Sequence, residues 1–196
     1  PYTTLFRSRI YNNFVYDFLY PNPASVLAFI ENHDTDRFLG EGDNLPMLKQ
    51  ASTLLLTTRR IPQLYYGTEV MMNGVKSKSD GYVRKDFPGG WTGDATNALT
   101  PAGRTKIQNE CYDFYKTILN WRKGNDVIAK GNMVQFMVQN GVYAYARQYE
   151  GKTVFVMLNG TDAETTVPLK FYKEILKDSK QGKDILSGKA ITFGEE

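Results

Sequence analysis

Polar side chains capable of chemistry are concentrated in one segment, FIENHDTDR at residues 29–37. Its candidates are Asn32, His33, Asp34, Asp36 and Arg37. Cleavage of a glycosidic bond passes through an oxocarbenium-like state, so it needs carboxylates near the sugar, and an imidazole can hydrogen-bond to hydroxyls. Two other interpretations stay open. One is a capped loop with a local Asp36–Arg37 charge cluster. The other is part of a Ser-His-Asp triad, which is disfavoured because adjacent side chains leave an extended backbone in opposite directions.

A second group of polar and aromatic side chains lies between residues 61 and 91. Asp80 and Arg84 are four residues apart and could be an ordinary surface ion pair. Asp86 could contact a substrate or belong to a turn with the following Pro88-Gly89-Gly90. Four aromatic residues could form a stacking wall for sugar rings or pack into a core: Tyr65, Tyr66, Phe87 and Trp91.

The elements that position these residues read as an α/β unit. Residues 9–20 predict an amphipathic helix whose apolar side carries Ile10, Phe14, Phe18 and Leu19. The apolar run 26–30 predicts a strand covered on both faces. A helix capped by Asp43 or Asn44 follows, and residues 61–67 predict a second strand. Strand, helix and strand form one crossover of the kind that repeats in parallel barrels.

The remaining sequence predicts a long loop, then a helix, and then a series of β-strands. Residues 68–103 predict a long loop of the kind that is usually functional or disordered. Residues 104–123 predict a helix that ends at Gly124, with an inward side made of Ile107, Cys111, Phe114, Ile118 and Leu119. From residue 126 the period becomes two, with turns at Asn140-Gly141 and Glu150-Gly151. We therefore predict an α/β domain over 9–125 and an antiparallel, sandwich-like β-domain over 126–196, which is incomplete.

Composition excludes several classes of function. The chain has 196 residues, a net charge of +3 and no run of like charges, so nothing indicates nucleic acid or an anionic membrane as a partner. One His and one Cys make a zinc site of the usual kind improbable and exclude an internal disulfide. The sequence has no membrane span or signal pattern. Residues 1–8 match the translation of a common sequencing adapter and are set aside as an artefact, and both ends look cut.

FIENHDTDR closely resembles the seventh barrel strand of the α-amylase family of glycoside hydrolases. The resemblance extends to DFLYPNP at 17–23, IPQLYYGTE at 61–69 and DGYVRKDFPGGW at 80–91, the first and last as in neopullulanases and cyclomaltodextrinases. It implies the C-terminal part of a (β/α)8 TIM barrel followed by a truncated β-sandwich-like domain. It further implies that Asp34 is a catalytic carboxylate that stabilises the transition state. The resemblance also assigns substrate binding to His33, Asn32, Asp80 and Arg84. The last two would bind hydroxyls of the next sugar toward the non-reducing end.

The resemblance also shows what the chain lacks. The family takes its nucleophilic Asp and its acid/base Glu from the fourth and fifth strands, and neither segment is present, so we predict no hydrolase activity for this chain alone. The intact parent is expected to cleave α-glucosidic bonds in starch-derived oligosaccharides or pullulan with retention. The alternative is a non-catalytic glycan-binding or transporter-subunit relative. The resemblance implies a periplasmic or extracellular location, no cofactor in this segment, and calcium in some intact members. Arg60 departs from the Gly that usually precedes Ile-Pro in the family, and it could strain the barrel entrance or mark a sequence error.

Overall fold

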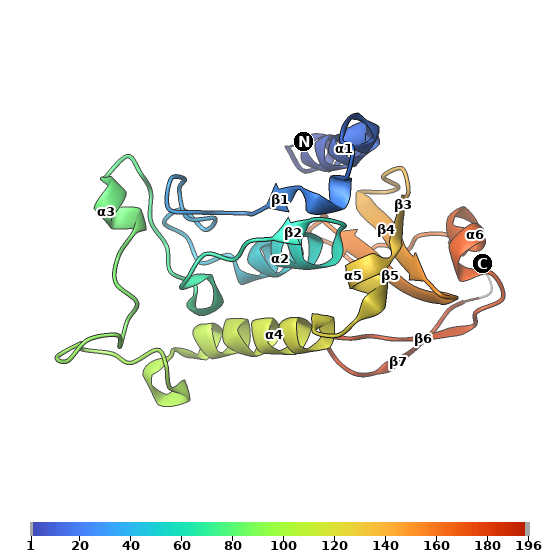
Figure 1. Ribbon diagram of the computed structural model, residues 1–196. Helices are drawn as coiled ribbons and strands as arrows, with labels where there is room; N and C mark the ends of the chain where they lie inside the picture. The colour runs from blue at the N-terminus through green and yellow to red at the C-terminus, as the bar shows by residue number, and fades with distance from the viewer. Residues whose placement is uncertain (1, 195–196) are drawn as a thin grey trace. The chain divides into compact units, whose positions relative to one another are not determined.

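The structure is a computed structural model that describes residues 2–194, with side chains from residue 9 onward. By its internal contacts the chain divides into two compact units (Figure 1). The first comprises Leu27–Leu56 and Ile61–Asn120, and the second comprises Pro1–Val26, Thr57–Arg60 and Trp121–Glu196. Within residues 2–194 no helix combines the length and apolar character needed to cross a membrane. The artefact prediction for residues 1–8 falls on side chains outside the described part.

The first unit contains a parallel strand pair. Strand β1 (Leu27–Ala28) pairs with β2 (Ile61–Pro62), with Leu27 opposite Ile61. The α-helix α2 (Leu45–Thr57) connects them, and Asn44 caps it by accepting the Met47 amide hydrogen. The predicted order of strand, helix and parallel strand is therefore confirmed, as is the cap.

The predicted barrel segment is not found. Each strand has two residues, and β1 and β2 are the only parallel strands among the described residues. The expectation of a strand over 26–30 covered on both faces is also wrong, because Leu27 is 53% and Phe29 42% exposed. Gln63 donates to Ala28 O at 2.8 Å, so the nitrogen of Pro62 points away from β1 and its missing N–H costs this ladder no bond.

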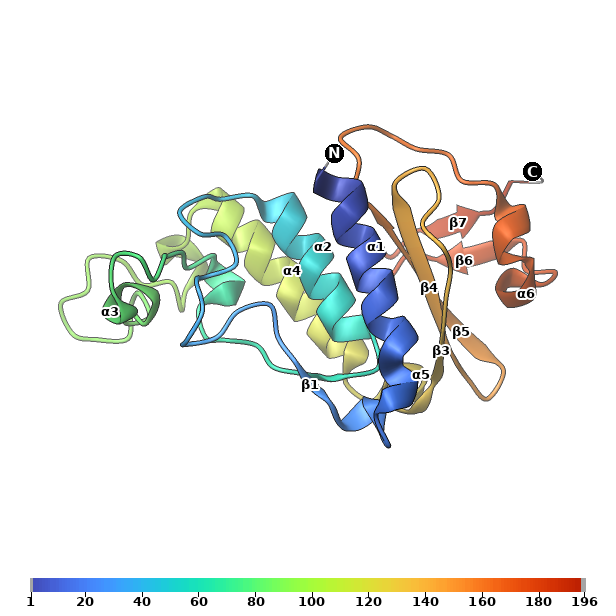
Figure 2. The same ribbon diagram turned by 90° about the horizontal axis from the view of Figure 1, so that it is seen from above.

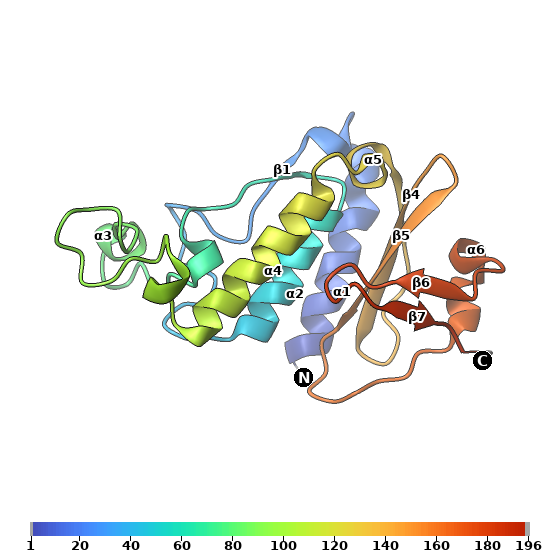
Figure 3. The same cartoon turned by 90° about the horizontal axis from the view of Figure 1, so that it is seen from below.

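Helix α4 (Lys106–Arg122) supplies the other half of this unit's core. It lies alongside α2 (Figures 2 and 3), and the hydroxyls of Ser52 and Tyr115 form a buried hydrogen bond between them. The two helices bury Leu45, Leu48, Leu55, Leu56, Cys111, Phe114, Tyr115 and Ile118. Ile107 and Leu119 were expected inward and are instead partly exposed, so the buried stripe is narrower than predicted.

Three short helices complete the first unit along the long loop. They are η3 (Thr68–Val70), α3 (Asp80–Val83) and η4 (Pro101–Gly103). The loop is tightly packed: a Cβ on Gly89 or Gly103 would come within 2.5 Å of Asn97 atoms. Asp94 accepts the amide hydrogens of Gly89 and Trp91, so Asp94 rather than Asp86 closes this turn.

The second unit is built around an antiparallel sheet in the order β3-β4-β5 (Figure 2). The strands are β3 (Asn132–Gln135), β4 (Val142–Tyr149) and β5 (Lys152–Asn159). Asn140-Gly141 and Glu150-Gly151 have positive φ at both positions, which is the geometry of two-residue hairpin turns. The predicted hairpins are confirmed.

A smaller sheet of β6 (Gln181–Lys183) and β7 (Ala190–Thr192) lies in the same unit (Figure 3). The sandwich is thus supported only in part, because the described sheets contain three and two strands. Tyr172 is fully buried and its ring lies 4.9 Å from Phe136 and 5.1 Å from Phe155. These rings form the core together with Ala144 and Leu176.

Helices cover the rest of this sheet-rich unit. They are α1 (Tyr2–Val15), η1 (Tyr16–Leu19), η2 (Pro23–Ser25), α5 (Asp126–Lys130), η5 (Leu169–Tyr172) and α6 (Lys173–Leu176). Gln135 on β3 donates to Tyr11 O on α1 at 3.1 Å. The helix expected over 9–20 ends at Val15, and Phe18 and Leu19, expected on its apolar side, are exposed. The domain boundary expected between 125 and 126 stays a prediction.

Candidate functional site

The loop that follows β1 turns sharply at Asn32. The Asn32 side chain accepts the Asp34 amide hydrogen at 2.8 Å, and the Thr35 amide donates to Asn32 O at 3.4 Å. Asn32 therefore shapes the turn that presents its neighbours. His33 and Asp34 project from this turn, with 59% and 62% of their side chains exposed.

His33 and Asp34 contact each other, contrary to the argument from an extended backbone. His33 Nε2 lies 3.2 Å from Asp34 Oδ2. The tight turn at Asn32 brings the adjacent side chains to one side, which an extended strand cannot do. The contact uses Nε2, the nitrogen that a Ser-His-Asp triad reserves for the serine, so the geometry also disfavours that interpretation.

Asp80 and Arg84 join the same site. Arg84 Nη2 donates to Asp34 Oδ1 at 2.9 Å and to Asp80 Oδ2 at 3.2 Å, and its Nε donates to His33 O at 2.9 Å. The structure thus brings together His33, Asp34, Asp80 and Arg84, which the sequence places about fifty residues apart. Arg84 therefore does more than pair with Asp80 at the surface, because it also binds His33 and Asp34.

Lys76 also belongs to the site and was not singled out from the sequence. Its Nζ lies 3.3 Å from Asp80 Oδ1 and donates to Asp34 O at 3.1 Å. Two carboxylates therefore face two cations, Lys76 and Arg84. The site is charge-balanced and open to solvent, which suits binding of a neutral, hydroxyl-rich ligand better than binding of an ion. A lysine in a loop gives no signal in one sequence, so it could not have been found there.

The interpretation of Asp36 and Arg37 as a local charge cluster is wrong. Asp36 Oδ1 accepts the Lys76 amide hydrogen at 2.6 Å, whereas Arg37 is buried and pairs with Glu31 at 3.2 Å. Successive residues of the turn face opposite environments, so sequence adjacency does not make them partners.

The four predicted wall aromatics have different surroundings. Tyr65 and Tyr66 pack edge to face at 4.6 Å, and the Arg37 guanidinium carbon lies 4.0 Å from the Tyr65 ring centroid. Burial raises the pKa of Tyr65, so it stays a neutral hydrogen-bonding group at ordinary pH. Phe87 is half-buried, whereas Trp91 is 67% exposed on the loop that Asp94 closes. No described contact joins Phe87 or Trp91 to the two tyrosines.

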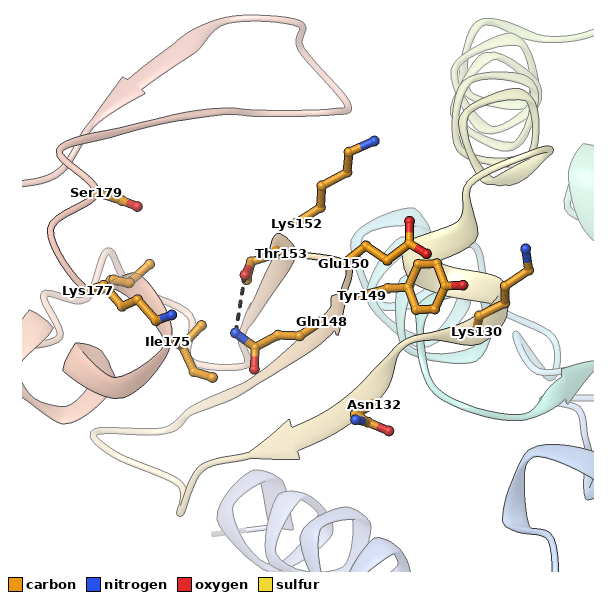
Figure 4. A pocket seen from close by; sticks show the side chains of 12 residues that line it. Lys130, Asn132, Gln148, Tyr149, Glu150, Lys152, Thr153, Ile175, Lys177 and Ser179 are labelled. Carbon is orange, nitrogen blue, oxygen red and sulfur yellow. Dashed lines mark hydrogen bonds between the residues drawn. The ribbon is translucent and has the colours of Figure 1, made fainter.

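The described residues also include an open hollow of about 530 Å³ in the sheet-rich unit, at the β4–β5 turn (Figure 4). Lys130, Lys152 and Lys177 line it, and so do the cross-strand neighbours Gln148 and Thr153, with Gln148 donating to Thr153 at 3.3 Å. None of the predicted site residues contributes to this hollow. Among residues 2–194, no three His, Cys, Asp or Glu side chains are arranged to hold a metal ion.

Comparison with known proteins gives matches in both units. Residues 133–196 match the model of the cyclo-malto-dextrinase C-terminal domain. An α-amylase of Niallia circulans is 30% identical over 86% of this chain and 29% of its own length. A cyclomaltodextrin glucanotransferase of Thermoanaerobacterium thermosulfurigenes is 31% identical over 82% of this chain and 21% of its own. The chain therefore spans less than a third of these relatives.

Solved structures agree with the sequence relatives. The α-amylase of Geobacillus thermoleovorans, solved with acarbose, matches 95% of this chain and 38% of its own with a TM-score of 0.70. Its sequence is 23% identical, so this likeness concerns the fold alone. The γ-CGTase of Alkalophilic bacillus clarkii matches 76% of this chain and 20% of its own, with a TM-score of 0.57 and 27% identity. By these sequence and structural matches, the chain is similar to enzymes of the α-amylase family.

Proposed function

We propose that this chain contributes the Asp34 site to an enzyme that acts on α-glucosidic bonds of starch-derived oligosaccharides. The observation that carries the proposal is the convergence of His33, Asp34, Asp80 and Arg84 on one exposed, charge-balanced site. In this role Asp34 stabilises positive charge on the sugar ring as the bond breaks. His33, Asp80 and Arg84 hydrogen-bond to hydroxyls, and Asn32 shapes the turn and contacts the sugar.

The catalytic machinery is divided between this chain and the rest of the enzyme. A retaining glycosidase needs a nucleophilic carboxylate and an acid about 5 Å apart. Asp34 is held by His33 and Arg84, and Asp80 by Lys76 and Arg84. Arg84 contacts both carboxylates, so we assign neither Asp34 nor Asp80 to the acid that must protonate the leaving group. We assign the nucleophile and the acid to residues outside this chain.

The named relatives include hydrolases and glucanotransferases, so the acceptor is water or a second sugar. The match to a cyclo-malto-dextrinase domain and the neopullulanase-like loop at 80–91 favour cyclic dextrins and pullulan among the substrates. A periplasmic or extracellular location is part of the proposal through the same resemblance. Loss of activity on adding a chelator, followed by recovery with calcium but not with other divalent ions, would indicate calcium in the intact enzyme.

The proposal is tested by comparing the 196-residue chain with the enzyme encoded by the intact gene. We expect the intact enzyme to release reducing ends from maltooligosaccharides, cyclodextrin or pullulan, and the chain alone to release none. Turnover by the purified chain would contradict the assignment of the nucleophile and acid to other segments. Absence of an Asp and a Glu after the fourth and fifth strands of the intact protein would favour a non-catalytic glycan binder.

A further inference from the structure

Glu31 and Arg37 form an ion pair that solvent does not reach. Arg37 Nη1 lies 3.2 Å from Glu31 Oε1, and the side chains are 1% and 2% exposed. Because desolvation offsets much of the attraction, a buried ion pair is weak evidence for stability. The contacts that the pair makes with the surrounding backbone therefore decide what it does.

Glu31 closes the loop that carries His33 and Asp34. Its Oε2 accepts the Phe38 amide hydrogen at 2.5 Å, so the residues that flank the loop are joined directly. Its other oxygen accepts the hydroxyl hydrogen of Thr68, which anchors the loop to η3. Glu31 thus accepts three hydrogen bonds from within the protein and is only 2% exposed, so it does not face a substrate.

Arg37 ties this loop to two other segments. Its Nε donates to Val83 O at 3.0 Å, and Nη1 donates to Tyr66 O at 2.7 Å. Val83 directly precedes Arg84, the residue that holds Asp34 and Asp80. Arg37 Nη2 has no hydrogen-bond partner in the described part of the chain, so Nε and Nη1 make the connection.

We propose that Glu31 and Arg37 are positioning residues, which lock the His33–Asp34 turn against the Val83–Arg84 backbone and so fix the site's geometry. Their importance for catalysis rests on the proposed function of Asp34. The effect of Glu31 and Arg37 on the two loops can be measured on the 196-residue chain without any sugar. Failure of this positioning role can therefore be distinguished from failure of the proposed catalytic role of Asp34.

The test is hydrogen–deuterium exchange of the chain, followed at single residues by NMR, in the wild type and in Arg37→Lys. Lysine keeps the charge but cannot reach both carbonyls. We expect the amides of Arg37, Gly74 and Lys76, which hydrogen-bond within the site's loops, to exchange at least about tenfold faster. Amides in the middle of α2 and α4 should keep the wild-type rates. His33 is the only histidine, so its ring signals, which should shift, report on the site without overlap.

Arg104→Lys is the matched control. Arg104 is also a buried arginine of this unit, and it donates to Ala98 O, away from the site's hydrogen bonds. It should leave the loop amides and the His33 signals unchanged. Glu31→Gln is the second variant, and it keeps the shape of the side chain. It should speed exchange of the same loop amides and leave the helix amides unchanged, so it provides the test if Arg37→Lys does not fold. Unchanged loop exchange, or an equal increase in the loops and both helices in Glu31→Gln, would overturn the proposal.

Discussion

At the scale of single residues, Arg60 shows how a sequence anomaly is explained by a partner. A positively charged side chain at the entrance of a strand suggested strain, but Arg60 lacks positive φ and pairs with Asp17. Its Nη1 also donates to Pro23 O at 2.9 Å, and Arg59 lies 2.6 Å from the same carboxylate. Asp17 is only 3% exposed, so these two arginines rather than solvent surround its carboxylate.

We predict that Arg60→Met destabilises the chain by about 3 kcal/mol, because it leaves the buried Asp17 charge with one cation instead of two. The free energy of unfolding from urea titration measures this. Asp17→Asn combined with Arg60→Met should recover part of the loss. Lys130→Met, which breaks the exposed pair with Asp126, is the control and should have no measurable effect. Equal effects of Arg60→Met and Lys130→Met would contradict the account.

Cys111 provides a prediction for pH. Burial raises the pKa of its thiol to about 12, whereas an unfolded cysteine titrates near 8.5. Between these values the unfolded chain releases a proton that the folded chain retains, so this residue's contribution to stability is lost as pH rises through that window. At pH 8.5 we expect a thiol reagent to label native Cys111 at least about a hundredfold more slowly than the urea-unfolded chain.

Exposed cysteine on the same helix is the matched control for this labelling. In Cys111→Ala combined with Lys116→Cys, the thiol lies on the exposed side of α4 and should react at nearly the unfolded rate. Native labelling of Cys111 at the rate of this control would show that the thiol is accessible.

At the scale of elements, the turns are where the sequence specifies backbone conformation most directly. Gly151 has φ +76° and no atom within 4 Å of an added Cβ. An alanine there meets no steric contact, so its cost comes from the backbone alone. We predict that Gly151→Ala lowers the free energy of unfolding by about 1 kcal/mol. Gly194→Ala, at a glycine without positive φ and in open space, is the control and should have little effect. No difference between the two variants would contradict the turn assignment.

Local signals predicted some elements well and others poorly for physical reasons. The Asn140-Gly141 and Glu150-Gly151 turns and the cap at Asn44 depend on neighbouring residues, and the sequence sufficed for them. Burial of strand β1 depends on elements that must pack against it, so an apolar run could not establish it. The Glu31–Arg37 pair and the role of Lys76 were missed because they depend on how distant loops meet.

At the scale of the whole molecule, the chain holds two kinds of unit and spans under a third of its named relatives. One unit carries His33, Asp34, Asp80 and Arg84, and the sheet-rich unit matches a domain found at the C-terminus of cyclo-malto-dextrinases. Activity is therefore proposed for the intact enzyme, in which the remaining carboxylates complete the site.

The most direct test of the central claim is Asp34→Asn in the intact enzyme, with Asp36→Asn as its matched control. Asparagine keeps the shape of either carboxylate, and at Asp36 it can still accept the Lys76 amide hydrogen. If Asp34 stabilises charge on the sugar in the transition state, Asp34→Asn lowers kcat by about a hundredfold or more, while Asp36→Asn stays close to wild type. Nearly wild-type kcat in Asp34→Asn, or equal losses in both variants, would contradict the account.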